Sequence, residues 1–452
     1  MLVNYRKLLS VFLAYALALT AFGLVSDKHG QPSLWVTAAE FTRQVTLNDP
    51  LTFLKSGVEI ASNGWLLPES TWVFRLWPPG FVLLLAGLFK FFGTDVPFLA
   101  LLFGLTILFG ANMLLTAYCY LTEYVAGAVA FLLPLIPFLF PVTRFFLLQP
   151  LGLSLGEGFS IIFFLSAVFS LLLAVARSSI WYALNSAVFF AMSAYFRSQY
   201  ELLVTALLLS GAAFWIARQG FVYFFRKDLT AGKESIGVRY ILIAIVGAQL
   251  LMLPWRVNNY LDTKTVSWVR TQELVARNSL MSEAELLRID GDLVIRGGGD
   301  LACRFEPTFC NSSDTALFYK AFFQNLQKWV FYKLSLVEDF WYPSLEFFPS
   351  AAVDQALPDF WGNSIIAFLL FASFFLLFSM KKRDGILWLW VLTSVYGALS
   401  VVLLLVQLEV RYFFLIKILA LFSFFTFVGM IFPFFVKSRE LNADSCRLRG
   451  HS

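Results

Sequence analysis

Long apolar runs separated by short polar breaks make up most of the chain. Runs of about 20 residues are long enough to cross roughly 30 Å of hydrocarbon as an α-helix. Bounding each run by its polar flanks predicts ten spans, at 8–25, 97–120, 125–141, 158–176, 180–196, 200–217, 237–255, 361–380, 386–406 and 412–436. A further run at 81–92 follows two prolines, contains Lys90 and is too short to cross. The pattern predicts an all-α polytopic membrane protein.

The composition supports this fold class. Of 452 residues, 59% are apolar and 14% are charged, a little over half the charged share of globular domains. This balance excludes disordered, collagen-like and coiled-coil chains and argues against a soluble enzyme. Four cysteines and two histidines are too few for a disulfide scaffold or for the usual zinc sites. The net charge of +5 identifies no partner, and we expect a lipid bilayer and no nucleic acid.

The positions of Lys and Arg set the expected orientation, because short cytoplasmic loops carry an excess of positive charge. If 81–92 lies along the membrane surface, the basic clusters at 218–239 and 381–383 share one side with Arg6 and Lys7. If 81–92 crosses instead, both clusters move to the opposite side. We therefore expect ten crossings, both termini in the cytoplasm and a juxtamembrane helix at 81–92.

This topology divides the chain into four parts. An N-terminal membrane module covers 1–255 and includes a first outer loop at 26–96. A large outer loop at 256–360, richer in acidic than in basic residues, is expected to form a subdomain. C-terminal membrane helices at 361–436 and a cytoplasmic tail at 437–452 complete the chain.

Three local signals occur in the large outer loop. Cys303 and Cys310 would form a disulfide if the loop faces an oxidising compartment, and would remain thiols in the cytosol. Ser282 followed by Glu285 predicts a helix start with a capping box. The three glycines at 297–299 predict a turn.

Ionisable residues gather at the outer ends of the expected spans and not in their middles. The set comprises Asp49, Arg75, Arg144, Glu157, Arg197, Glu201, Arg256, Glu409 and Arg411. Transporters usually carry ionisable groups or broken helices near mid-membrane. The distribution therefore favours a site at the outer interface, although membrane crossing alone is compatible with a transporter, a channel, an enzyme or a scaffold.

The stretch after Asp49 has apolar residues at a helical period. Pro50 follows Asp49 directly, so Asp49 is expected to cap an interfacial helix that stops at Gly64. Capping alone would account for Asp49. Arg197 and Glu201 are four residues apart, and they could pair with each other or take part in binding an anion.

Several motifs follow one another in a recognisable order. After Asp49 come Phe53, Gly57 and Gly64, then WPPG at 77–80, Glu157 at the start of a span, PWRVNNY at 254–260 and EVRY at 409–412. In order and topology these resemble the GT-C-fold glycosyltransferases that use polyprenyl-phosphate sugars, a group that includes protein O-mannosyltransferases and aminoarabinose transferases.

The resemblance implies transfer of one sugar from a polyprenyl phosphate to an acceptor on the outer face, with inversion at the anomeric carbon. Asp49 would be the catalytic base, and Glu157 a second acid that contacts a metal or the acceptor. Guanidinium groups suit the donor phosphate, and the candidates are Arg75, Arg197, Arg256 and Arg411. Glu409 and Tyr412 would support this site.

The chain departs from the family pattern at three positions. Pro50 stands where an acid commonly follows the catalytic acid, and Trp77 where a lysine precedes the paired prolines. Asn258 stands where an arginine is expected, and the arginine is displaced to Arg256. Arg75 could replace the missing lysine. These departures leave the sugar and the acceptor open.

We therefore expect an integral membrane glycosyltransferase whose site faces away from the cytoplasm. Its partners would be the bilayer, a polyprenyl-phosphate sugar and a lipid, glycan or protein acceptor, in the plasma or inner membrane of a prokaryote rather than the endoplasmic reticulum. A divalent cation such as Mg²⁺ or Mn²⁺, held by Asp49 and Glu157, is an open alternative. The competing hypotheses are a lipid or solute transporter and a polymerase or ligase of lipid-linked glycans.

Overall fold

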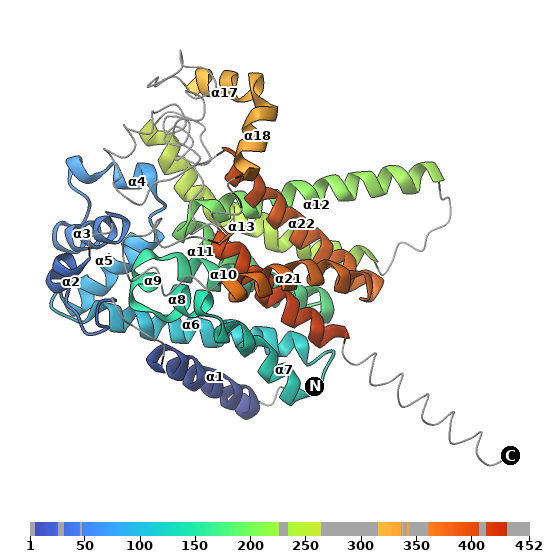
Figure 1. Ribbon diagram of the computed structural model, residues 1–452, viewed down its shortest axis with the longest axis horizontal. Helices are drawn as coiled ribbons and strands as arrows, with labels where there is room; N and C mark the ends of the chain where they lie inside the picture. Colours follow the sequence, from blue (N-terminus) through green and yellow to red (C-terminus); the bar gives the residue numbers. More distant parts are fainter. Residues whose placement is uncertain are drawn as a thin grey trace.

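The computed structural model of the chain is a bundle of α-helices, and no strand occurs among the residues that it describes (Figure 1). The described residues are 5–25, 31–45, 48–225, 234–263, 315–335, 337, 341–342, 360–405 and 413–431. The predicted all-α class is confirmed.

Seven helices are long and apolar enough to cross a membrane, within the described part of the chain. They are α1 (Tyr5–Val25), α6 (Phe98–Leu121), α10 (Glu157–Arg177), α13 (Glu234–Thr263), α21 (Phe360–Phe378), α22 (Lys382–Leu405) and a final helix at Phe413–Ile431. Each coincides with an expected span. Together they indicate a multi-pass integral membrane protein.

The other three expected spans take different forms. α11 (Ile180–Phe196) is apolar but has only 17 residues, and the run at 200–217 lies inside α12 (Ser198–Phe225). The run at 125–141 is not one straight helix, because the segment Gly127–Leu139 meets α8 (Pro141–Leu148) at 90°. Prolines at 134, 137 and 141 lack the amide hydrogen that an α-helix requires. The first part is accordingly α7 (Gly127–Leu132) followed by a 3₁₀ helix, η2 (Leu133–Leu139). The count of ten crossings stays a prediction.

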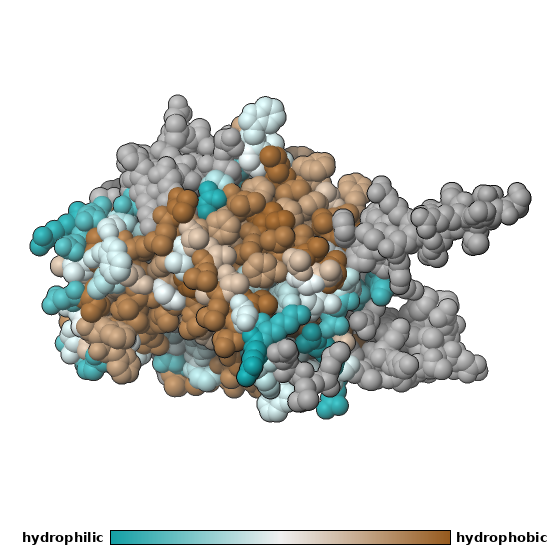
Figure 2. Space-filling view, turned by 90° about the horizontal axis from the view of Figure 1, so that it is seen from below, coloured by the Kyte–Doolittle hydropathy of each residue, from teal (hydrophilic) through white to brown (hydrophobic). Residues whose placement is uncertain are grey.

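α10 is the central helix of the bundle. It packs against α6, α11 and α13, and also against α8 and the short α9 (Pro150–Leu155). Of its apolar segment, 94% is buried inside the protein, compared with 17% for α1. α10 therefore forms the core, whereas α1 turns most of its surface outward. Seen from below, an apolar surface covers the middle of the molecule, with hydrophilic residues towards its left end (Figure 2).

The first outer loop folds into short helices at one end of the bundle, which we call the outer end (Figure 1). These are α2 (Ala38–Gln44), α3 (Asn48–Asn63), the 3₁₀ helix η1 (Pro68–Ser70), α4 (Val73–Leu76) and α5 (Gly80–Phe92). α5 has 13 residues, which corresponds to about 20 Å and falls short of the roughly 30 Å of a hydrocarbon core. It packs along α3. This agrees with a helix at 81–92 that does not span a membrane.

Two short helices of the large outer loop are described, α17 (Thr315–Gln324) and α18 (Leu326–Ser335). α13 continues to Thr263, past the expected loop start at 256. The predicted capping box at Ser282 and the glycine turn at 297–299 lie outside the described residues. The same holds for Cys303 and Cys310.

Candidate functional site

Two glycines fix how closely the first outer loop packs. A methyl group added to Gly57 of α3 would lie 2.7 Å from Cβ of Leu85 in α5. A methyl group on Gly80, the last residue of the WPPG motif, would lie 2.5 Å from the carbonyl oxygen of Tyr195 in α11. Both distances are too short for a side chain. Gly57 therefore lets α3 and α5 meet, and Gly80 lets α5 meet the outer end of α11.

Asp49 lies in the first turn of α3 and is partly buried. The helix begins at Asn48, so the prediction that Asp49 is the N-cap is wrong. The predicted stop is confirmed: Gly64 has φ +83°, and its N–H donates to the carbonyl oxygen of Ile60 at 2.8 Å. Phe53 follows Asp49 by one helical turn, so both residues lie on the same face of α3.

The contacts of Phe53 show where this face of α3 points. The Phe53 ring packs edge-on against Trp77 and Phe81, with centroids 5.2 and 5.6 Å away. Cζ of Arg197 lies 5.3 Å from the centroid of the same ring, within the distance at which a guanidinium is attracted to an aromatic face. The helix face that carries Asp49 is thus brought next to Arg197.

Arg197 occupies the break between α11 and α12, where its backbone is extended with φ −149° and ψ 125°. Glu157 is the first residue of α10 and follows the left-handed Gly156. Nη2 of Arg197 lies 3.3 Å from Oε1 of Glu157 and donates to the carbonyl oxygen of Leu155 at 2.6 Å. The side chains of Arg197 and Glu157 are each only 8% exposed. The pair is therefore a buried ion pair formed by two helix breaks.

One hydrogen-bond donor of the Arg197 guanidinium is not used in these contacts. Its Nε is buried and has no hydrogen-bond partner among the described residues. Buried donors are normally satisfied, and a guanidinium donor is well suited to a phosphate or carboxylate oxygen. An anion bound to Nε would leave the contact of Nη2 with Glu157 in place.

A second ion pair links α13 to α12. Nε of Arg256 donates to Oε1 of Glu201 at 2.6 Å, and Nη2 of Arg256 donates to Oε1 of Gln249 at 2.6 Å. The neighbouring Trp255 packs edge-on against Phe74 of α4, with centroids 5.6 Å apart. The outer end of α13 is thus fastened to α12 and to the first outer loop.

Arg197 and Glu201 do not pair with each other, which was one of the two interpretations of their spacing. A spacing of four brings side chains together only within one helix. Arg197 lies outside α12 in an extended conformation, whereas Glu201 lies in its first turn. Each residue therefore finds its partner on a different helix.

Among the remaining sequence candidates, the structure describes the side chain of Arg144, which makes a different contact. Nη1 of Arg144 donates to the carbonyl oxygens of Phe138 and Leu139 at 3.0 and 2.7 Å, so its guanidinium closes the end of η2. The side chain of Arg75 lies outside the described residues. So do Glu409, Arg411 and Tyr412.

The sequence interpretation missed Lys417, which is fully buried in the final helix. Its Nζ donates to the carbonyl oxygen of Trp341 at 2.8 Å and to Oδ1 of Asn363 at 2.6 Å. The Trp341 ring centroid lies 4.9 Å from the ammonium. A lysine within the apolar run at 412–436 was the available signal, because such residues in membrane spans usually have a specific role.

A pair of amides connects the first outer loop to the bend between α8 and α9. Nε2 of Gln31 donates to Oε1 of Gln149, which is 4% exposed, and Oε1 of Gln31 accepts from the amide N–H of Leu151 at 3.2 Å. Isolated glutamines carry no sequence signal that would have predicted this contact. It adds a second attachment of the loop to the bundle.

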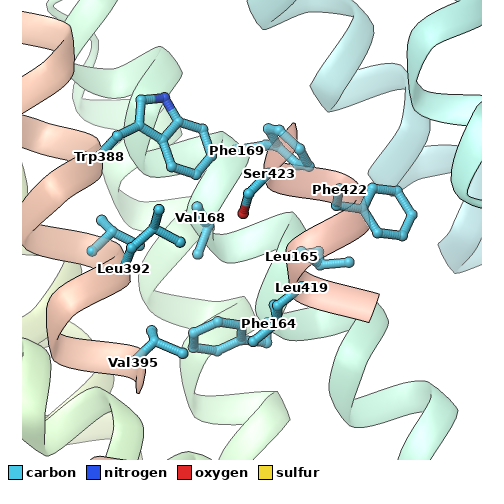
Figure 3. A pocket seen from close by; sticks show the side chains of 11 residues that line it. Phe164, Leu165, Val168, Phe169, Trp388, Leu392, Val395, Leu419, Phe422 and Ser423 are labelled. Atoms are coloured by element: carbon cyan, nitrogen blue, oxygen red, sulfur yellow. The ribbon is translucent and has the colours of Figure 1, made fainter. Parts of the chain in front are cut away.

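A small apolar pocket lies between α10, α22 and the final helix (Figure 3). Its walls include Phe164, Trp388, Leu392 and Phe422, and the Ser423 hydroxyl is part of its lining. The cavity volume is about 20 Å³, close to the room that one water molecule needs. This pocket is a gap in the helix packing and cannot hold a sugar or a lipid.

Metal ligands do not cluster in the described part of the chain, where no group of three His, Cys, Asp or Glu side chains could hold an ion. Glu157 directs a carboxylate oxygen to Arg197 instead. A divalent cation bound through Asp49 and Glu157 stays a prediction.

Comparisons of the chain with models of protein families and with curated proteins find no match. The resemblance to the GT-C glycosyltransferases, which depends on the order of the motifs, stays a prediction.

Proposed function

We propose that the protein is an integral membrane glycosyltransferase that moves a sugar from a polyprenyl phosphate to an acceptor on the outer face. The contact between Arg197 and Phe53 carries the proposal. Because Phe53 follows Asp49 by one turn, an acid of the first outer loop and a buried arginine–glutamate pair of the bundle share one region. These are the two kinds of group that such a transfer needs, a base and a phosphate-binding cation.

In the proposed reaction, the carboxylate of Asp49 takes the proton of an acceptor hydroxyl. The hydroxyl oxygen attacks the anomeric carbon while the bond from that carbon to the phosphate oxygen breaks. The bonding electrons leave with the phosphate, which gains negative charge. A single displacement of this kind inverts the anomeric carbon.

Arg197 is the proposed partner of the departing phosphate. Its buried Nε would stabilise the charge that develops on the phosphate oxygens, and this type of contact is most effective where water is excluded. Glu157 would orient the guanidinium through the 3.3 Å contact. Arg256 is a weaker candidate, because two of its nitrogens already donate to Glu201 and Gln249.

The decisive experiment compares the variant Asp49→Asn with the wild-type chain, each reconstituted in liposomes that contain a polyprenyl phosphate carrying a labelled sugar. The assay measures the rate at which the labelled sugar is transferred to the acceptor. Removal of a general base is expected to lower the transfer rate by about 10²–10⁴-fold. Asp95→Asn is the matched control, because Asp95 lies in the same outer loop and is exposed. Undiminished transfer by Asp49→Asn would remove Asp49 from the catalytic role.

The same preparation separates the competing functions. A product larger by one sugar supports the transferase, whereas transfer of a whole oligosaccharide indicates a polymerase or ligase. Substrate flux into sealed vesicles without any glycosylated product indicates a transporter.

A further inference from the structure

α18 turns apolar side chains outward and a lysine inward. Trp329 and Lys333, one turn apart, are 0% and 3% exposed, whereas Phe331 and Leu334 are 64% and 57% exposed. A helix on a water-covered surface has the reverse distribution, with apolar residues inside and lysines outside. The part of the outward side that carries Phe331 and Leu334 is therefore suited to an apolar medium.

α17 extends this outward apolar side. Its Phe322 is buried and packs edge-on against Trp329, with centroids 5.5 Å apart, whereas the adjacent Phe323 is 69% exposed. We call the exposed set the α17–α18 face; it consists of Tyr319, Phe323, Leu326, Phe331 and Leu334. Single exposed apolar residues are common on protein surfaces, but a group of five on two short helices indicates an interaction surface.

A hydrogen bond fixes the level of α18 relative to the membrane helices. Nε1 of Trp329 donates to the carbonyl oxygen of Leu404 at 2.7 Å. Leu404 is the last residue of the apolar segment Asp384–Leu404 of α22, which is long enough to cross a membrane. Figure 1 shows α18 at this end of α22. The α17–α18 face therefore lies at the level where α22 meets the membrane surface.

Polar residues occupy a third side of α18. Successive residues of a helix point about 100° apart, so Lys328 and Ser335 lie about 20° from each other, about 100–120° from Leu334 and about 40–60° from Phe331. Both are exposed. A lysine at the membrane surface keeps its charge in water and can reach the lipid phosphates. Leu334 thus points away from the polar side of α18, and Phe331 lies at the border of that side.

We propose that the α17–α18 face is an interfacial anchor that inserts Phe323, Phe331 and Leu334 into the outer leaflet of the bilayer. Lys328 lies at the level of the lipid phosphates. The occupant of this face is lipid, and the anchor keeps the large outer loop on the membrane surface. This assignment is independent of the reaction that the protein catalyses.

Photo-crosslinking of the full-length chain tests the anchor. The photoreactive residue p-benzoylphenylalanine is placed at Phe331, at Leu334 or at Ser335, and the protein is reconstituted in liposomes of phosphatidylethanolamine and phosphatidylglycerol. After irradiation, mass spectrometry measures the phospholipid adducts. Ser335 is the matched control, because it is exposed and adjacent to Leu334 but points to the polar side.

At least fivefold more lipid adduct is expected at Leu334 than at Ser335, with an intermediate yield at Phe331. Equal yields at the three positions would overturn the proposal. So would adducts at Phe331 and Leu334 that join two protein chains. Both positions are exposed, and each gives an independent reading if the other variant is not obtained in folded form.

Discussion

Two arginine–glutamate pairs close the outer ends of the central helices, and the chain holds them in different ways. Arg197 lies in an extended break and pairs with the first residue of α10, and both side chains are 8% exposed. Arg256 lies within α13 and pairs with Glu201, and these side chains are 18% and 12% exposed. Arg256 uses its Nε to join α13 to α12 and its Nη2 for a bond within α13, whereas the buried Nε of Arg197 has no hydrogen-bond partner among the described residues. The same pair of residue types can therefore fasten two helices in one place and leave a buried donor unsatisfied in another.

The largest expected effect comes from breaking the more deeply buried pair. Arg197→Met removes the guanidinium that faces the buried Glu157 carboxylate, and we expect a loss of about 3–5 kcal/mol in the free energy of unfolding. Unfolding of the purified protein in detergent measures the change. The double variant Arg197→Met/Glu157→Met should recover most of the loss, because it removes both charges. A double variant as unstable as the single one would contradict this account.

A smaller effect is expected for the second pair. Arg256→Met removes two charge-assisted hydrogen bonds, but Glu201 is more exposed than Glu157 and regains some hydration. We expect a loss of about 2 kcal/mol, measured by the same unfolding assay. A loss larger than that of Arg197→Met would reverse the comparison between the two pairs.

Burial also affects Lys333, which lies outside the membrane helices, in α18. Burial lowers its pKa to about 7, compared with about 10.4 for an exposed lysine. Between these values the unfolded chain binds more protons than the folded chain, so stability rises with pH by up to about 1.4 kcal/mol per pH unit. Below pH 7 the lysine is charged in both states, and its burial is least favourable.

Hydrogen exchange of the α18 amides at pH 7 and pH 8.5, corrected for the intrinsic rate, measures this dependence. The protection of α18 should increase over the interval in the wild-type chain and stay constant in Lys333→Met. Equal pH dependence in both chains would show that another group titrates.

The smallest effect is expected at the opposite end of the bundle. Arg177 and Glu123 form an ion pair with an Nη2–Oε1 distance of 2.8 Å, but their side chains are 37% and 42% exposed. Water screens such a pair, so Glu123→Gln should cost less than about 1 kcal/mol. A loss close to that of Arg197→Met in the unfolding assay would mean that burial does not decide the strength of these pairs.

Much of the fold could be predicted from the apolar runs, because the length of each run can be compared directly with the thickness of a membrane. Seven of the ten expected spans correspond to long apolar helices, and Gly64 ends α3 where its position predicted. The run at 125–141 forms two helical segments that meet at 90°, and hydropathy did not predict this bend because it does not register prolines. Local hydrogen bonding, and not hydrophobicity, decides that bend.

The candidate site was less predictable, because its contacts join distant parts of the chain. Asp49, Glu157 and Arg197 were identified by residue type and position. The pairing of Arg197 with Glu157 depends on two helix breaks, and sequence spacing suggested Glu201 instead. Lys417 shows the opposite case, since its position within an apolar run was visible but its partners Trp341 and Asn363 were not.

The contact of Gly80 with Tyr195 has a consequence for engineering this protein. An added carbon would lie 2.5 Å from the carbonyl oxygen of Tyr195. Gly80→Ala should therefore push the N-terminus of α5 away from α11. Larger residues at this position would form a graded series that lifts the N-terminus of α5 step by step. Such a series would measure how far the first-loop helices can be displaced from Arg197 before the proposed sugar transfer stops.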